Sequence, residues 1–174
     1  IAPDLLTIAK GLGGGYQPIG AMLASGKIID TIRAGSGVFQ HGHTYLAHPL
    51  ACAAALAVQE VIREDRLLDR VKERGKQLEQ RLIDRFGNHR HVGDIRGRGL
   101  FWAIELVTDR GSKEPAAELA KRTTAGARER GLILLSCGTH GNVIRILVPL
   151  VIDDDDLARG LEILEESLVD ARAG

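Results

Sequence analysis

Hydrophobic residues in the first third of the chain occur in short runs separated by glycines, a pattern typical of strands joined by turns. Residues 4–9 and 19–25 form two such runs with β-branched members, and Pro18 lies between them. We therefore predict two strands connected through a turn. Isoleucines recur at helical spacing in residues 27–33, which predicts a helix, and the segment up to Thr44 is expected to be a loop.

Helical spacing dominates the middle of the chain. Pro49 suits a first helical turn, and an alanine-rich run continues from it through Ile62, so we predict a long helix. The apolar positions of residues 67–86 fall mostly on one face, which predicts an amphipathic helix. Gly87 and Asn88 are expected to end it.

Strand and helix patterns alternate from about residue 90 onward. Strands are predicted around Val92 and Ile95 and at 100–107, 133–136 and 143–152, and helices at 115–130 and from 153 onward. Gly131 occupies the position where a left-handed residue commonly ends a helix. The acidic residues 153–156 suit the positive start of the last helix. The alternation predicts an α/β module with its own apolar core.

The 174 residues could form one domain or two small ones. The chain opens on Ile1-Ala2-Pro3-Asp4, without an initiator methionine or a leader. We interpret it as the interior of a longer polypeptide, and expect it to be incomplete as an enzyme.

Composition excludes several classes of function. The 23 basic and 23 acidic residues cancel, so no electrostatic reason exists to expect nucleic acid or an anionic membrane surface as a partner. No apolar run approaches the roughly 18–20 residues of a membrane span. Cys52 and Cys137 are too few and too dispersed for a disulfide framework or a zinc site. We expect two reduced thiols in a cytoplasmic protein.

Lys10 has the clearest chemical potential in the chain. It follows the apolar run Leu5–Ala9 and precedes Gly11, which places it at the carboxyl end of a predicted strand, at a glycine-rich turn. A partly desolvated lysine in such a place can form a Schiff base with a carbonyl compound. The alternative is a solvated lysine in an ordinary connection between a strand and a turn.

Three segments carry motifs whose order and spacing are more specific than any one of them. They are Asp4-Leu5-Leu6-Thr7-Ile8-Ala9-Lys10 with the following Gly13-Gly14 and Pro18-Ile19-Gly20-Ala21, His41-Gly42-His43-Thr44-Tyr45-Leu46-Ala47-His48-Pro49-Leu50-Ala51, and Gly138-Thr139-His140-Gly141-Asn142-Val143-Ile144-Arg145-Ile146-Leu147-Val148-Pro149-Leu150. Together they resemble the class III pyridoxal 5′-phosphate (PLP) dependent aminotransferases, with the third in the form seen in 4-aminobutyrate aminotransferases.

The resemblance implies a fold and a division of the chain. It implies the α/β fold of type I PLP-dependent transferases, of which this chain would be the C-terminal part. Residues 1–66 would be the C-terminal end of the PLP-binding large domain, and residues 67–174 the C-terminal small domain. Residues that stack on the cofactor ring and pair with its pyridinium nitrogen would then lie upstream.

The same resemblance implies the site residues. Lys10 would form the aldimine with PLP and act as the catalytic base. Thr44 would hold the cofactor phosphate, with the backbone of His43 and Gly42 beside it, and this loop would reach the cofactor of the other subunit in a homodimer. Arg145 would bind the substrate carboxylate.

Arg145 can also be considered without the resemblance. It lies in an otherwise apolar strand, so its guanidinium must either point to solvent or be paired. Alternation places Val143, Arg145 and Leu147 on one face of the strand, which favours an arginine that faces a cleft.

The activity that follows is transfer of an amino group from an ω-amino acid or amine to a 2-oxo acid such as 2-oxoglutarate or pyruvate. Two alternatives stay open: other class III chemistry, by an aminomutase or a decarboxylase, and an inactive fragment that serves only folding or dimerisation. A metal site at His41, His43 and His48 is not expected, because their spacing does not match zinc ligands and no further Cys or His completes the set.

Overall fold

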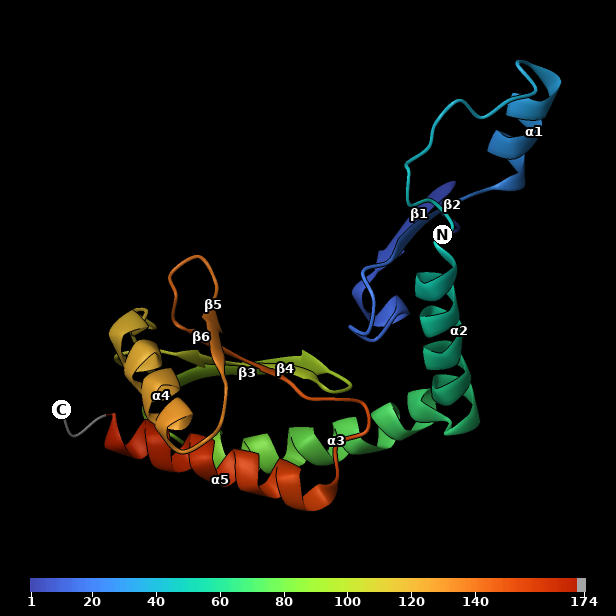
Figure 1. Ribbon diagram of the computed structural model, residues 1–174. Coiled ribbons are helices and arrows are strands. Elements are labelled where there is room, and N and C mark those ends of the chain that lie inside the picture. Colours follow the sequence, from blue (N-terminus) through green and yellow to red (C-terminus); the bar gives the residue numbers. More distant parts are fainter. Residues whose placement is uncertain (172–174) are drawn as a thin grey trace. The chain divides into compact units, whose positions relative to one another are not determined.

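Residues 1–171 are described by the computed structural model. The chain divides into two units, Ile1–Arg66 (unit 1) and Leu67–Gly174 (unit 2). The elements are labelled in Figure 1. Unit 1 contains β1 (Leu5–Ala9), a 3₁₀ helix (Lys10–Leu12), β2 (Gly20–Ala24), α1 (Gly26–Ala34) and α2 (Pro49–Glu64).

Strands β1 and β2 form an antiparallel hairpin, as the sequence pattern predicts. Leu5 pairs with Ala24 at one end and Ala9 pairs with Gly20 at the other. All five residues of β1 are exposed, and in β2 only Ala24 is partly covered. The hairpin therefore has no buried face among the described residues.

Helix α2 begins where Pro49 predicts it, because proline suits the first helical turn, where the backbone N–H has no partner. His48 caps the helix, since its Nδ1 accepts a hydrogen bond from the Ala51 N–H at 3.4 Å. Further along, the Gln59 side chain donates to the Leu12 carbonyl at 3.1 Å. This bond ties the turn after Lys10 to α2.

Unit 2 is a two-layer α/β structure. Its elements are α3 (Leu67–Phe86), β3 (Val92–Arg98), β4 (Phe101–Leu106), α4 (Ala117–Glu129), β5 (Leu135–Cys137), β6 (Val143–Leu147) and α5 (Asp154–Asp170). The sheet order is β3-β4-β6-β5, and every neighbouring pair is antiparallel.

The apolar core of unit 2 lies between one face of the sheet and helices α3, α4 and α5 (Figure 1). Its largest fully buried side chains are those of Phe86, Leu78, Leu82, Ile104, Leu106, Ile144, Leu164 and Leu168. Within residues 67–171, the same three helices leave the opposite face of the sheet open. That open face carries the alternate residues of each strand.

A contact between backbones fixes the β3–β4 turn against α3. An added Cβ at Gly75 would lie 2.7 Å from the Gly99 carbonyl oxygen and 2.8 Å from its Cα. Gly99 itself is left-handed (φ 59°) in the turn between the two strands. Glycine is therefore required at position 75 for this close approach.

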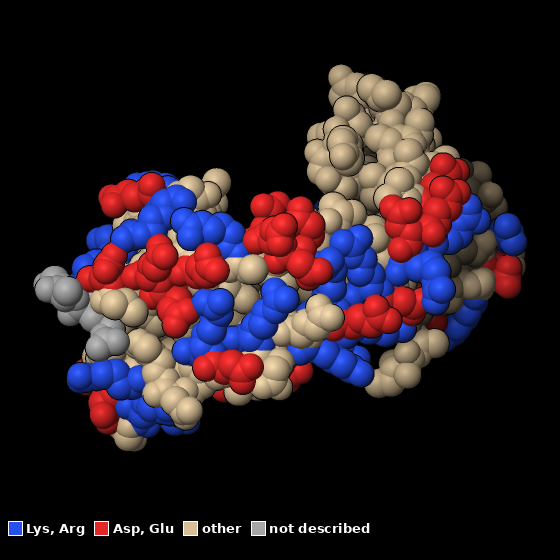
Figure 2. Space-filling view, turned by 90° about the horizontal axis from the view of Figure 1, so that it is seen from below, with Lys and Arg blue, Asp and Glu red and all other residues tan. Residues whose placement is uncertain are grey.

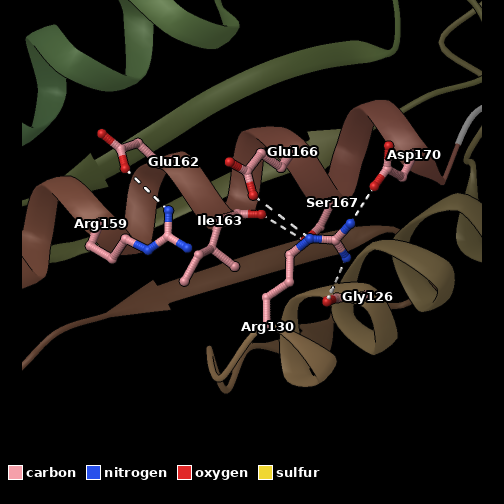
Figure 3. Close-up of polar contacts among 8 residues, drawn as sticks. All are labelled: Gly126, Arg130, Arg159, Glu162, Ile163, Glu166, Ser167 and Asp170. Carbon is pink, nitrogen blue, oxygen red and sulfur yellow. Dashed lines mark hydrogen bonds and ion pairs between the residues drawn. The ribbon is translucent and has the colours of Figure 1, made fainter.

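Arg130 joins α4 to α5, as the close-up in Figure 3 shows. Its guanidinium contacts Glu166 (3.7 Å) and Asp170 of α5, and donates to the Gly126 carbonyl of α4 at 3.1 Å. These contacts hold the C-terminal end of α4. Gly131, which follows Arg130, is left-handed (φ 87°), as expected.

The clearest differences from the predicted boundaries lie in β6, β5 and α4. The last strand ends at Leu147 because Pro149 cannot donate a ladder hydrogen bond and residues 150–151 form a turn. Strand β5 is shorter and later than predicted. Helix α4 starts at Ala117, since Pro115 forms an isolated bridge with Val107.

Candidate functional site

Lys10 follows the last residue pair of the β1–β2 hairpin, as the sequence predicts. Its backbone is left-handed (φ 53°), which is uncommon for a residue other than glycine. Its carbonyl accepts a hydrogen bond from the Gly13 N–H at 3.2 Å, which closes the turn. The side chain is exposed and has no partner among residues 1–171, so its amine is available for chemistry.

The segment of Gly42, His43 and Thr44 lies directly ahead of α2, and all three residues are exposed. The His43 carbonyl accepts from the Leu46 N–H at 3.0 Å, which forms the turn that contains Thr44. Within the described residues, neither the Thr44 hydroxyl nor the Thr44 N–H has a partner. These two free donors have the chemistry that a phosphate dianion requires.

A surface hollow of about 880 Å³ lies in unit 1 beside this segment. His43, Tyr45 and Cys52 line one part of it, and Met22 of β2 lines another. Lys10 and Thr44 are not among its lining residues. The structure thus places His43 in a concave region and leaves Lys10 and Thr44 on the surface of the same unit.

Arg145 lies in β6 with its side chain on the open face of the sheet. Its neighbours in the strand, Ile144 and Ile146, point into the core, so alternation directs Arg145 to the other side. It is partly exposed and makes no ion pair or hydrogen bond with any described residue. Arg145 also borders a hollow of about 330 Å³, most of whose other lining residues are apolar.

The open face also carries Arg96 and Arg98 of β3, whose positions were not predicted to matter. Arg96 donates to Asp94 at 2.7 Å and to Glu105 at 2.6 Å. The hydrogen bond to Asp94 first, and that to Glu105 second, hold the pKa of Arg96 above its ordinary value. We call Asp94, Arg96 and Glu105 the ion triad. Only the alternation of strand residues could have indicated this group from the sequence. Asp94 and Arg96 are two residues apart in β3, and Glu105 lies in β4, the next strand.

Charges of both signs intermix on the face of unit 2 that carries α3 and α5, as Figure 2 shows. This mixture fits the balanced composition of the chain. No group of three metal-binding side chains gathers among residues 1–171. No helix in that range is both long and apolar enough to cross a membrane.

Comparison with known proteins identifies the family. The family described as aminotransferase class-III matches residues 1–168, so the chain belongs to that family, as the three motifs predict. The 5-aminovalerate aminotransferase DavT of Pseudomonas aeruginosa is 46% identical over 166 residues, which are 95% of this chain and 38% of the relative. The 4-aminobutyrate aminotransferase GabT of Escherichia coli is 40% identical over 172 residues, with coverage of 99% and 39%.

Family members with other names are also similar. An ethanolamine-phosphate phospho-lyase homologue of Caenorhabditis elegans is 35% identical over 167 residues, covering 95% of this chain and 35% of the relative. The chain spans less than two fifths of the length of each of these three relatives.

Solved transaminase structures share the fold. A transaminase from the marine bacterium Virgibacillus superimposes with a TM-score of 0.92 at 31% identity, over 99% of this chain and 40% of that one. A Pseudomonas amine transaminase in its PLP-bound form gives a TM-score of 0.88 at 34% identity, over 98% and 39%. The predicted α/β class, as part of a PLP-dependent transferase fold, is confirmed.

Proposed function

We propose that the protein carrying this chain is a PLP-dependent aminotransferase that moves an amino group from an ω-amino acid or amine to a 2-oxo acid. The observation that carries the proposal is Lys10, an unpaired lysine at the end of a strand in a chain of the class III family. The names of the similar DavT and GabT proteins support an ω-amino acid as the donor.

The residues of unit 1 fit the cofactor. Lys10 offers an amine without a partner, and Thr44 offers two free donors for a phosphate. When bound, PLP supplies an electron sink for the substrate carbon that bears the amino group. Lys10 would attach the cofactor and, once released, would accept and return the proton at that carbon.

Arg145 would bind the substrate carboxylate. Its planar guanidinium matches a carboxylate with two parallel hydrogen bonds, and no described residue competes for it. Residues 1–66 would belong to the large cofactor-binding domain and residues 67–174 to the small domain. The protein would act as a cytoplasmic homodimer in which Gly42, His43 and Thr44 reach the cofactor of the other subunit.

Reduction and peptide mapping test the central assignment. Borohydride treatment of the full-length protein with PLP should leave a pyridoxyl group on the peptide that contains Lys10, and Lys10→Ala should abolish both the label and turnover. Lys27→Ala is the matched control, because this lysine is also exposed in unit 1, and it should change neither. A label on any other lysine would remove Lys10 from the mechanism.

Product analysis separates the rival chemistries. An aminotransferase converts more than one equivalent of donor to an oxo compound or aldehyde only when a 2-oxo acid is present to take up the amino group. A decarboxylase would release carbon dioxide, an aminomutase would return an isomer of the amino acid, and a phospho-lyase would release phosphate. Failure to bind PLP would favour the remaining alternative, a chain that serves only folding or dimerisation.

A further inference from the structure

Arg96 and Arg145 belong to one transverse row on the open face of the unit 2 sheet. Arg96 of β3 pairs with Ala103 of β4, Ala103 pairs with Arg145 of β6, and Arg145 pairs with Leu135 of β5. Directly paired residues on antiparallel strands share a face, with Cβ atoms roughly 4.5–5.5 Å apart. The Cβ atoms of the two arginines are therefore about 10 Å apart across one strand.

The residue between the two arginines is small. Ala103 has only a methyl group, so it places no side chain between the two guanidinium groups. Each arginine side chain is long enough to reach over Ala103. Without other interactions, both could therefore bind the same incoming carboxylate.

The ion triad prevents this competition. Arg96 binds two carboxylates, Asp94 at 2.7 Å and Glu105 at 2.6 Å, whereas Arg145 binds none within the described residues. The triad holds one positive and two negative charges, so its net charge is −1. Within this row the triad repels an anion and Arg145 attracts one, whereas Arg98, which pairs with Phe101, lies in the next row of the same face.

We propose that Asp94 and Glu105 are positioning residues that direct the substrate carboxylate to Arg145 by occupying Arg96. The inference rests on the proposed role of Arg145 and adds a reason why a single binding geometry results. A carboxylate shared between two arginines would sit nearer to β4, and its reactive end would be displaced from the position that turnover requires.

The test uses the full-length enzyme loaded with PLP and the variants Glu105→Gln and Asp94→Asn, alone and combined. Butyrate, a carboxylate without an oxo group, serves as the probe, and its inhibition constant is measured against the 2-oxo acid. Freeing Arg96 should strengthen butyrate binding by about two- to fivefold, the range expected for exposed charge pairs. The kcat for the 2-oxo acid should fall while its KM does not rise.

A purely structural role gives a different pattern. Loss of packing alone would weaken butyrate binding, raise KM and lower the melting temperature together, and that result would overturn the proposal, as would unchanged butyrate binding. Glu165→Gln is the matched control, because it breaks another 2.6 Å ion pair of unit 2, that with Arg85. It should leave butyrate binding and kcat as they are.

Arg145→Ala separates this inference from the proposed function. Weaker butyrate binding in Arg145→Ala, with no effect of the triad variants, would reject only the role of Asp94 and Glu105. Unchanged butyrate binding in Arg145→Ala would reject the carboxylate site itself and the inference with it. If the double variant does not fold, the single variant Glu105→Gln still tests the proposal, because it removes one of the two carboxylates on Arg96 and leaves the bond to Asp94, so butyrate binding should strengthen by less than in the double variant.

Discussion

At the scale of a single residue, Lys10 has an uncommon backbone conformation. A left-handed conformation at a residue other than glycine costs roughly 1–3 kcal/mol and persists only where the surroundings impose it. Here the β1–β2 pairing ends at Ala9, and the Gly13 N–H binds the Lys10 carbonyl. An asparagine or glycine would adopt this conformation at lower cost. Ala47, Arg66 and Lys113 share this conformation, so the proposed role of Lys10 rests on its place after β1 and on the family match.

Thr44 permits a direct test at the same scale. Thr44→Val removes one hydroxyl donor to the proposed phosphate and keeps the shape of the side chain. Because a hydrogen bond to a charged group contributes about 1.5–3 kcal/mol, PLP should dissociate about ten- to a hundredfold more readily. Titration of the full-length apoenzyme with PLP measures the change.

Thr44→Ser is the control for this variant, since it keeps the hydroxyl and should bind PLP nearly as the wild type does. Equal affinity of the valine variant and the wild type would show that Thr44 has no part in binding the cofactor. The circular dichroism spectra should coincide, because Thr44 is exposed and its side chain contacts no described partner.

Single contacts between elements decide the geometry of unit 2. Helix α3 approaches the β3–β4 turn so closely that the backbones of Gly75 and Gly99 touch. This contact fixes the hairpin that carries the ion triad. The position of the hairpin therefore depends on one residue far from the triad in sequence.

Gly75→Ala should destabilise unit 2. The new Cβ would lie 2.7 Å from the Gly99 carbonyl oxygen, so the turn would have to move, at a cost of about 1–3 kcal/mol. Gly160→Ala in α5 is the matched control, because its Cβ would meet only Leu132 at 3.7 Å. It should stabilise the helix by about 0.5–1 kcal/mol. Urea unfolding measures both, and equal free energies of unfolding for the two variants would contradict the role of the contact.

Most elements could be predicted from the sequence because their signals are local. Three such signals are the apolar stripe of α3, Pro49 at the start of α2 and Asp153 at the start of α5, and each reflects interactions within a few residues. Asp153, for example, accepts a hydrogen bond from the Asp156 N–H at 2.7 Å. The left-handed backbone of Lys10 could not be predicted, since lysine has no preference for it. The ion triad was missed because a cross-strand partner depends on register.

At the scale of the whole molecule, burial is unequal between the two units. Unit 2 has a continuous core, whereas in β1 and β2 apolar side chains remain exposed, including Leu5 at 55% and Met22 at 50%. An isolated two-stranded hairpin is at best marginally stable. The chain by itself therefore combines a stable unit with a hairpin that lacks covering partners.

Hydrogen exchange should show this difference. In the 174-residue chain, amides of β4 and β6 should be protected, because they lie in the interior of a four-stranded sheet over the core. Amides of β1 should exchange within seconds. Mass spectrometry of peptides from residues 5–9 and 143–147 compares them, and equal protection would show that the hairpin is stable without further cover.

The transverse row that joins Arg96, Ala103, Arg145 and Leu135 also has a consequence for the order of folding. The β3–β4 hairpin can close early, since its strands are separated only by a short turn. Strand β6 pairs with β4 across the intervening α4 and β5, so this pairing requires closure of a longer loop and is expected to form later. Arg145 is therefore expected to reach its place after the ion triad, and a chain stalled after the hairpin would hold the triad without the proposed carboxylate site.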